Sequence, residues 1–553
     1  MNTEATLNEF IDTKKKAIIT VGLFSLVTSF LMLVIPLFTL QVLDRVISTR
    51  SVDTLIMLFV GAFFVLLLTS VLYLIRERIM SRIAIQVHEK IAPLIFRLLL
   101  KESAKNKENN QSNYLRDVYL LRYFFSGKAI FIFFEMIWVP VFISIIFLLS
   151  PMLGAVVGVA AVMILLLSLI AERIVRPQEA ITEKNKLNNI NQERLFISNA
   201  EVIEAMGMSS HVQNIWHKQQ IRDYSTDLKA DDVLSIIQSL MMLIRSTLNI
   251  SLMAVGAWLV INEYLSVGVV IASLIIGMRA ISPLESFIKS WRSINLFREI
   301  YRRLKNQIND VDKFKNNYAV TGVLKGNISV KNLVYVPFSG AKPILKGISF
   351  DLQSGKVMGI TGPNGSGKST LIKNVLGLYK PVSGSINIDD YDVTTLNREL
   401  LGNQLGYMKQ DAELMPGTIA ENISRLQPSP IDAVIDAAKL AGAHELIMSL
   451  KDGYSTEIKD GGSNLSGGQR QIIALARAVF GEPAFVVLDE PTAMLDMKET
   501  ELVARMLARL RNAGITILVV THQTRLLKEV DQIMVMKDGL IDSISPFNRR
   551  SAA

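Results

Sequence analysis

The chain has 553 residues, and at about 150 residues per domain this length excludes a single core and predicts about three to four units. Hydrophobic residues make up 50% of the chain and charged residues only 20%, so a disordered chain is excluded and membrane spans are expected. The net charge of +9 fits either a nucleic-acid partner or the basic cytoplasmic side of a membrane protein. The absence of cysteine excludes disulfides, thiolate zinc sites, iron–sulfur clusters and a cysteine nucleophile.

Six apolar runs of suitable length occur in the first 300 positions, and none follows. A helix needs about 20 apolar residues to cross about 30 Å of hydrocarbon. Only Ser150 and Pro151 separate the third run from the fourth, so a tight hairpin is expected there, because proline cannot continue the preceding helix. The expected spans are residues 17–40, 54–75, 129–150, 151–170, 236–261 and 265–284.

The connections between these runs alternate in length and in charge. Residues 76–128 and 172–232 are long and rich in Lys and Arg, whereas residues 44–53 and 262–264 are short. Because basic loops stay on the cytoplasmic side, both termini are expected in the cytosol. This distribution accounts for most of the positive charge, and no interleaving of aromatic and basic residues indicates a nucleic-acid surface. A membrane-embedded protein with no nucleic-acid partner is expected.

The two long connections carry helical periodicity, as Val118, Leu121 and Phe124 illustrate. We therefore expect the spans to continue as cytosolic helical extensions. These extensions would turn near residues 109–116 and 206–210 and dock onto a soluble domain. A plain solvated helical hairpin is the alternative.

Three ionisable residues lie inside the expected spans, namely Glu135, Arg245 and Arg279. An intramembrane charge is costly, so by default it marks an ion pair or a pathway. The three residues lie at similar distances from the outer ends of their spans, which implies one polar layer. We hypothesise that Glu135 pairs with one arginine and that the other arginine faces a cavity that conducts the substrate. The alternative places this layer at the inner interface, where arginine reaches water.

The composition changes after the last span. We expect a transmembrane domain at residues 1–300, a charged linker at 301–325 and an α/β domain at 326–553. Residues 357–361 are typical of a buried strand, and the next residues fit G-x-x-x-x-G-K-[ST] before a helix, which is a phosphate-binding loop. The loop consists of Gly362, Pro363, Asn364, Gly365, Ser366, Gly367, Lys368, Ser369 and Thr370.

This loop predicts a binding site for ATP with Mg²⁺. Its glycines let backbone N–H groups point at phosphate oxygens, and the following helix adds the positive end of its dipole. Lys368 is expected at the β- and γ-phosphates and Ser369 at the magnesium ion.

A second apolar strand, residues 485–488, runs directly into Asp489 and Glu490. Ligands bind at the carboxyl edge of the sheet in open α/β folds, so both carboxylates are expected at the phosphates. Asp489 is expected to hold the metal, and Glu490 to polarise the water that attacks the γ-phosphate. A strand cap without chemistry is the alternative for this pair.

Ser466, Gly467 and Gly468 stand at a helix start between these two motifs, and here the chain resembles the ATPases of ABC transporters. The resemblance implies that Gln410 senses magnesium and the attacking water, that Asp496 belongs to the D-loop, and that His522 contacts the γ-phosphate. A buried structural histidine is the alternative for His522. The signature motif that carries the resemblance is Leu465, Ser466, Gly467, Gly468 and Gln469.

In this family the signature motif closes on the nucleotide held by the partner's phosphate loop. The resemblance therefore implies a head-to-tail homodimer that encloses two ATP molecules. Lys368, Glu490, His522 and Ser466 are all present, so neither site needs to be degenerate. A separate partner chain is the alternative.

One departure concerns the aromatic residue that stacks on adenine in this family. Aligning the flanking residues puts Pro337 at that position. Tyr335 is our candidate for the adenine platform, and Phe338 is the alternative.

Six spans followed by one ATPase resemble an ABC exporter half-transporter: an α-helical membrane domain with cytosolic helical extensions, fused to an α/β P-loop nucleotide-binding domain of ABC type. Residues 198–208, 279–285 and 291–304 resemble type I secretion ATPases of the metalloprotease-exporter, PrtD-like kind. The resemblance implies an unfolded polypeptide cargo with a carboxy-terminal signal, a periplasmic adaptor and an outer-membrane channel, and hence the bacterial inner membrane. A lipid or drug exporter is the alternative, and an ATP-gated regulator without pumping is a second one that Glu490 disfavours.

Overall fold

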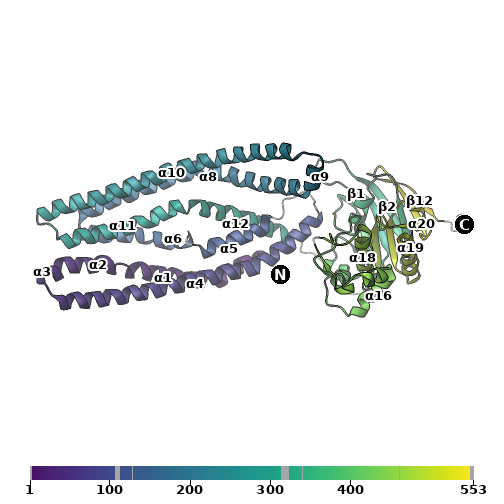
Figure 1. Cartoon of the computed structure of the whole chain (residues 1–553), viewed down its shortest axis with the longest axis horizontal. Helices are drawn as coiled ribbons and strands as arrows, with labels where there is room; N and C mark the ends of the chain where they lie inside the picture. The colour runs from purple at the N-terminus through teal and green to yellow at the C-terminus, as the bar shows by residue number, and fades with distance from the viewer. Residues whose placement is uncertain are drawn as a thin grey trace. The chain divides into compact units, whose positions relative to one another are not determined.

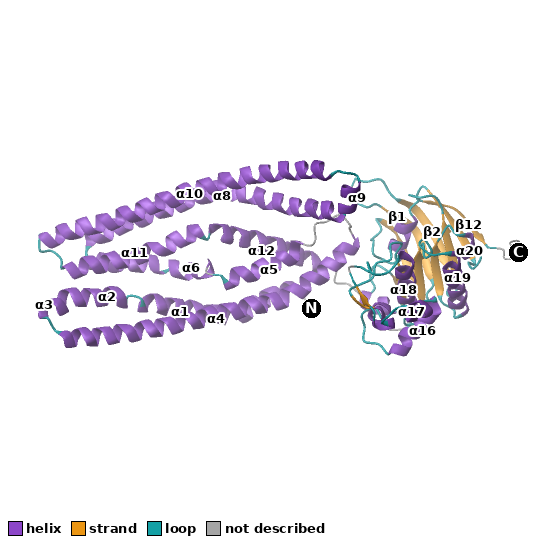
Figure 2. Ribbon diagram, in the orientation of Figure 1, coloured by secondary structure: helices purple, strands orange, loops and turns teal. Residues whose placement is uncertain are grey.

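The computed structural model describes the backbone of residues 3–105, 113–127, 129–312, 323–338, 340–459 and 461–547. The chain divides into two compact units, Met1–Lys313 and Phe314–Ala553. Figure 2 shows helices throughout unit 1, whereas the strands occur in unit 2. Residues 301–312 of the expected linker belong to a helix of unit 1, and residues 313–322 lie outside the described part.

Unit 1 is a bundle of long helices that run side by side (Figure 1). Six helical segments within the described residues are long and apolar enough to cross a membrane, which confirms the number of predicted spans. The helices are α1 (Thr3–Leu31), α2 (Val34–Gln41), the π-helical η1 (Val42–Val46), α3 (Ile47–Thr49), α4 (Val52–Lys105), α5 (Asn113–Ser126), α6 (Ala129–Met136), α7 (Trp138–Leu149), α8 (Pro151–Ser198), α9 (Ala200–Ala205), α10 (Ser209–Ile261), α11 (Val267–Lys289) and α12 (Trp291–Asp312).

Three of these helices are far longer than a membrane is thick. Helices α4, α8 and α10 contain 54, 48 and 53 residues. At a rise of about 1.5 Å per residue they extend for about 70–80 Å, against about 30 Å of hydrocarbon, so they continue beyond the membrane. The second expected turn lies between α9 and α10, where Gly207 has a φ of +64°. The first expected turn, at residues 109–116, lies largely outside the described residues.

Prolines follow two breaks in the membrane helices and also lie inside continuous helices. Pro36 and Pro140 each stand third in the helix that follows a break, in α2 and α7, and Pro283 lies inside α11. A proline has no N–H group for the carbonyl four residues earlier, which frees that carbonyl. The carbonyls that lose this partner belong to Met32, Met136 and Arg279.

Unit 2 contains a six-stranded sheet in the order β12-β11-β3-β10-β9-β6, in which β12 is the antiparallel edge strand. A four-stranded antiparallel sheet, β2-β1-β4-β5, and the β7-β8 pair complete it. The strands are β1 (Ile328–Tyr335), β2 (Leu345–Leu352), β3 (Val357–Thr361), β4 (Ser383–Ile388), β5 (Tyr391–Asp392), β6 (Leu405–Met408), β7 (Gly417–Thr418), β8 (Glu457–Ile458), β9 (Phe485–Asp489), β10 (Thr516–Val520), β11 (Gln532–Lys537) and β12 (Leu540–Pro546).

The large sheet is covered on both faces, since its central strands β9 and β10 are buried at every position. Val486 and Leu488 face one core with α16, α18 and α19. Phe485 and Val487 face the other core, which the antiparallel sheet and α13 cover. The helices of unit 2 are α13 (Lys368–Val375), α14 (Arg398–Asn403), α15 (Ile419–Ile423), α16 (Ile431–Ala441), α17 (His444–Ser449), the 3-10 helix η2 (Gly453–Ser455), α18 (Gly467–Val479), α19 (Met497–Asn512) and α20 (Thr524–Leu527).

The strand register brings four motif-bearing loops to one edge of the sheet. In the parallel pairs Val520 aligns with both Ile360 and Asp489, and Met408 aligns with Leu488. Strands β6, β9, β10 and β3 therefore end side by side. The residues that come directly after each of these four strands therefore lie at the carboxyl edge of the sheet.

Candidate functional site

The phosphate-binding loop connects β3 to α13 and depends on glycine at three positions. Gly362, Gly365 and Gly367 have φ values of +144°, +81° and +98°, which disfavour a side chain. A Cβ at Gly362 would also collide with the carbonyl oxygen of Met536. The Lys368 side chain is buried in the loop, and its Nζ donates to the carbonyl oxygens of Gly362 at 2.7 Å and Pro363 at 3.0 Å. The ammonium group of Lys368 is therefore held by carbonyl groups of the loop to which it belongs.

Asp489 ends β9 and is only 4% exposed. Burial raises the pKa of its carboxyl group, while a hydrogen bond from Ser369 and the nearby Lys373 and Lys368 act in the opposite direction. Oδ1 of Asp489 is buried and accepts no hydrogen bond within the described residues. An orphaned carboxylate oxygen beside a hydroxyl suits Mg²⁺, which prefers oxygen ligands and completes its shell with phosphate oxygens and water.

Glu490 follows directly and adopts an unusual backbone conformation. Its φ of +50° lies in the left-handed region, which costs a non-glycine residue free energy and is common at functional sites. Its N–H donates to the carbonyl of Val520 at 3.0 Å. Nε2 of Gln410 donates to Oε2 of Glu490 at 3.0 Å. The structure thus brings together Glu490 and Gln410, 80 residues apart in the chain.

A buried amide that sequence reasoning missed holds this turn. Gln471 on α18 is 1% exposed. Its Nε2 donates to the carbonyl of Glu490 at 3.0 Å, and its Oε1 accepts the N–H of Met494 at 2.8 Å. Because both hydrogen bonds go to backbone, the side chain fixes the turn that carries Glu490. Its place two residues after the signature motif was a visible signal.

The remaining predicted residues lie on loops and helix starts around the same sheet. His522 follows β10 and is exposed, so the buried structural alternative is wrong; its Nδ1 lies 3.3 Å from Oγ1 of Thr361. Ser466 caps α18, accepting the N–H of Gln469 at 3.2 Å. Asp496 caps α19 in the same way, with Glu499 as its partner at 2.7 Å.

The adenine candidates have very different surroundings. Tyr335 is 8% exposed, and its ring stacks on Tyr379 with centroids 5.0 Å apart and planes 7° apart. This packing leaves Tyr335 without an exposed ring face. Phe338 is 70% exposed. Of the two aromatic side chains, only Phe338 offers a face to a base.

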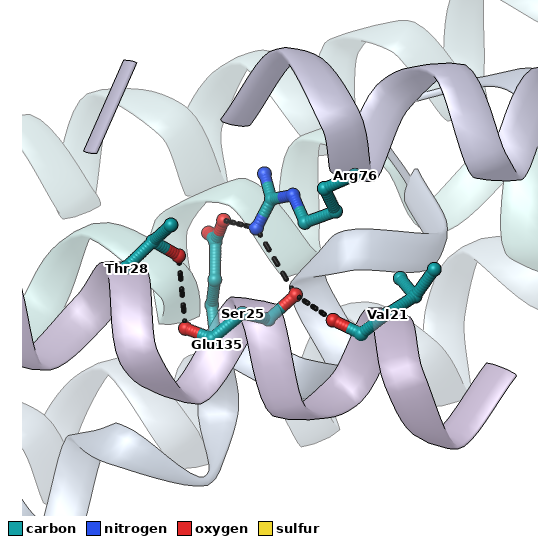
Figure 3. Close-up of polar contacts among 5 residues, drawn as sticks. All are labelled: Val21, Ser25, Thr28, Arg76 and Glu135. Atoms are coloured by element: carbon teal, nitrogen blue, oxygen red, sulfur yellow. Dashed lines mark hydrogen bonds and ion pairs between the residues drawn. The ribbon is translucent and has the colours of Figure 1, made fainter. Parts of the chain in front are cut away.

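In unit 1 the partner of Glu135 differs from the one that the sequence suggested. Glu135 does not pair with Arg245 or Arg279; its Oε1 lies 3.7 Å from Nη1 of Arg76 (Figure 3). Arg76 on α4 is 1% exposed, and Nη1 also donates to Oγ of Ser25 at 3.2 Å. The sequence placed Arg76 at the start of a cytosolic connection, directly after an apolar run. Since α4 continues well past this point, Arg76 packs inside the bundle instead.

The two predicted arginines have other neighbours. Nη1 of Arg245 lies 3.3 Å from Oε2 of Glu285 on α11. Nη2 of Arg279 lies 3.0 Å from Sδ of Met32. Glu135, Arg245 and Arg279 nevertheless line one cavity of about 530 Å³, as the hypothesis of a single polar layer requires.

Comparisons with known proteins cover nearly the whole chain. The family model "ABC transporter transmembrane region" matches residues 18–281, and the model "ABC transporter" matches residues 345–493. The type I secretion system ATP-binding protein PrsD of Rhizobium meliloti (strain 1021) is 32% identical, over 96% of this chain and 92% of that protein. The exotoxin translocation ATP-binding protein PaxB of Pasteurella aerogenes is 29% identical, over 95% of this chain and 75% of that protein.

Two further comparisons extend this picture. The leukotoxin translocation ATP-binding protein LktB of Mannheimia haemolytica is 30% identical, over 92% of this chain and 72% of that protein. A solved structure of a bacterial Atm1-family ABC exporter with ATP bound superposes with a TM-score of 0.82, covering 97% of this chain and 96% of that one. At 18% identity this likeness concerns the fold.

Proposed function

Since this chain belongs to the ABC transporters, among the ATP-binding proteins of type I secretion systems, we propose that it exports an unfolded polypeptide with a carboxy-terminal signal. It is an ATP-hydrolysing transporter of the inner membrane, with six spans and a cytoplasmic nucleotide-binding domain. The observation that carries the proposal is similarity to a secretion ATPase along 96% of the chain, including the membrane unit.

At the nucleotide site the residues have separate tasks. The loop amides and Lys368 bind the phosphates, and Phe338 stacks on adenine in place of Tyr335. Oxygens of Ser369, Gln410 and Asp489 hold Mg²⁺, which when bound neutralises charge on the phosphates. The orphaned Oδ1 of Asp489 supports this assignment.

Hydrolysis requires a water molecule aligned with the γ-phosphate. Glu490 accepts a proton from that water, and Gln410, hydrogen-bonded to Glu490, helps to orient it. His522 contacts the γ-phosphate. The left-handed backbone of Glu490 and its link to β10 support a fixed position for the carboxylate.

The site is completed by a second copy of the chain. Leu465, Ser466, Gly467, Gly468 and Gln469 of one copy close on the nucleotide of the other, with the D-loop residue Asp496 beside them. Ser466 is exposed at the start of α18, where backbone N–H groups and the helix dipole favour an anion. A homodimer with two ATP sites follows, and a periplasmic adaptor and an outer-membrane channel extend the export route.

The membrane cavity lined by Glu135, Arg245 and Arg279 forms part of the cargo pathway. ATP binding closes the two nucleotide-binding domains and shifts the spans outward, and hydrolysis resets them. Together with Arg76, these residues place four charged side chains around one cavity, which supports a polar route, since intramembrane charges are kept where they act.

The test is the ATPase rate of the purified protein in lipid nanodiscs. The probe is a synthetic peptide that copies the carboxy-terminal end of a candidate secreted protein encoded nearby. We expect saturable modulation by this peptide and none by its scrambled version. If lipids or small amphiphiles change the rate while several such peptides do not, the chain is a lipid or drug exporter and the proposal is wrong.

A further inference from the structure

The cavity in unit 1 has an unbalanced charge. Among the described residues that line it, Arg76, Arg245 and Arg279 carry guanidinium groups, and Glu135 carries the carboxylate. Glu285 lies behind Arg245 and adds a second negative charge. Three cations face two anions at membrane depth, where a charge without a partner is costly.

Arg76 forms the ion pair with Glu135. Its guanidinium group lies between two rings, 4.3 Å from the centroid of Tyr73 and 4.1 Å from that of Phe131. Together with Ser25 these contacts hold the cation where its closest anion is Glu135, at 3.7 Å (Figure 3). The ring faces attract the guanidinium group, and removing one partner of a buried ion pair is costly. Glu135 is therefore paired with Arg76, whose guanidinium group is held in place by these contacts.

Arg245 and Arg279 differ in their partners. Arg245 is paired with Glu285, whose side chain is 10% exposed. Arg279 has a contact with the thioether of Met32, which is a weak acceptor and carries no charge. No ion pair of Arg279 occurs within the part of the chain that the structure describes. Glu135 also attracts Arg279 electrostatically but forms its ion pair with Arg76, so among the described residues that line the cavity Arg279 is the surplus cation, with no carboxylate in direct contact.

The remaining lining combines apolar side chains with a few polar ones. Thr28, Thr69 and Ser282 line the cavity, and the hydroxyl groups of Thr28 and Thr69 donate to the carbonyls of Ser25 and Val65 on their own helices. The prolines of α2, α7 and α11 leave the carbonyls of Met32, Met136 and Arg279 without the N–H group four residues later. The volume of about 530 Å³ lies in the range of ligand sites, roughly 300–1,000 Å³.

We propose that Arg279 binds a carboxylate of the translocated polypeptide, so that the cavity selects segments with acidic residues or the chain's own carboxy terminus. This inference rests on the proposed function and adds the chemistry that the cavity recognises. A guanidinium group offers two parallel N–H donors that match the two carboxylate oxygens. Binding the cargo neutralises the surplus charge, which favours occupation of the cavity.

The experiment is a double-mutant cycle between protein and peptide, measured as ATPase modulation of the full-length protein in nanodiscs. Three peptides that differ only in their carboxylates are compared. The first has Asp, Glu and a free terminal carboxylate, and the second has Asn and Gln in place of Asp and Glu. The third keeps Asp and Glu but has an amidated terminus. We expect Arg279→Gln to raise the half-maximal concentration of the acidic peptide about tenfold or more. The neutral peptide should act equally on both proteins.

Two variants control for folding and for charge in general. Arg279→Lys keeps the charge and should retain most of the preference. Arg82→Gln removes an exposed arginine of α4 and should change nothing. Basal ATPase activity and the unfolding temperature of each variant show whether it is folded. The amidated peptide shows whether Arg279 binds the terminal carboxylate or the side-chain carboxylates.

The outcomes separate this inference from the function on which it rests. If the acidic and neutral peptides act at the same concentration on the unmodified protein, or if Arg279→Gln weakens both equally, Arg279 does not bind a carboxylate while peptide export stands. If no peptide of any charge modulates ATPase activity, both the export function and this inference are wrong.

Discussion

At the scale of single residues, the catalytic turn is held by an amide that touches no nucleotide. Gln471 binds the backbone on both sides of this turn, at Glu490 and Met494. Because Glu490 in this turn has a strained backbone, loss of the two Gln471 hydrogen bonds should let the turn move to a less strained conformation. We expect Gln471→Met to lower kcat about tenfold and to leave the KM for ATP nearly unchanged.

The matched control for Gln471 is Asn422. It is also 1% exposed, and its amide clamps the backbone at Met415 and Thr418. Asn422→Leu should lower the unfolding temperature without the selective loss of kcat. Equal losses of kcat in both variants would assign Gln471 a purely structural role.

The second residue-scale prediction concerns the base. Glu490→Gln keeps the size of the side chain but cannot accept a proton, so ATP hydrolysis should fall by about 10²–10⁴-fold while ATP still binds. The expected product is a closed dimer with trapped nucleotide, detected by size-exclusion chromatography with bound ATP. Glu413→Gln, at an exposed carboxylate, is the control. Hydrolysis at the rate of the unmodified protein would mean that another group is the base.

The motif residues were predictable from sequence because each lies in a contiguous signature, and the sheet register then places them together. The position of Gln471 beside the signature motif was visible, but its role and that of Arg76 were not, because both depend on partners elsewhere in the chain. The contact between Arg76 and Glu135 joins α4 to α6 across 59 residues, and no local pattern specifies it.

At the scale of elements, the helix break before Pro140 lies between two residues that line the membrane cavity, Glu135 and Trp138. Pro140 separates α6 from α7, and restoring an N–H at this position would give the Met136 carbonyl its helical partner. We expect Pro140→Ala to join the two helices, to raise the unfolding temperature by a few degrees and to weaken peptide modulation of the ATPase several-fold.

Pro93 lies exposed inside α4, so Pro93→Ala is the control for a general effect of proline removal. It should keep full peptide modulation. If Pro140→Ala also keeps it, the break does not contribute to the cargo pathway.

The spans themselves were predictable, since apolar runs of about 20 residues have one physical meaning. The breaks inside them were not assigned, because a proline in a membrane helix is tolerated wherever neighbours satisfy the freed carbonyl. Pro36 and Pro140 were present in the expected spans, yet their effect depends on the packing around them.

At the scale of the whole molecule, the proposed homodimer places each ATP between two chains. Lys368→Ala removes the phosphate-loop cation, and Ser466→Arg blocks the signature motif. Each variant alone should be inactive. Mixing the two chains restores one intact site in each heterodimer, so the mixture should regain ATPase activity. If Ser466→Arg alone is active, each chain completes its own site.

The central claim is that this protein uses ATP hydrolysis to move a polypeptide across a membrane. The most direct measurement reconstitutes it in liposomes with the nucleotide-binding domain outside and follows a labelled acidic peptide that becomes protected inside. We expect ATP-dependent accumulation that is absent with Glu490→Gln. ATP-dependent movement of labelled lipid across the bilayer, with no peptide accumulation, would contradict the claim.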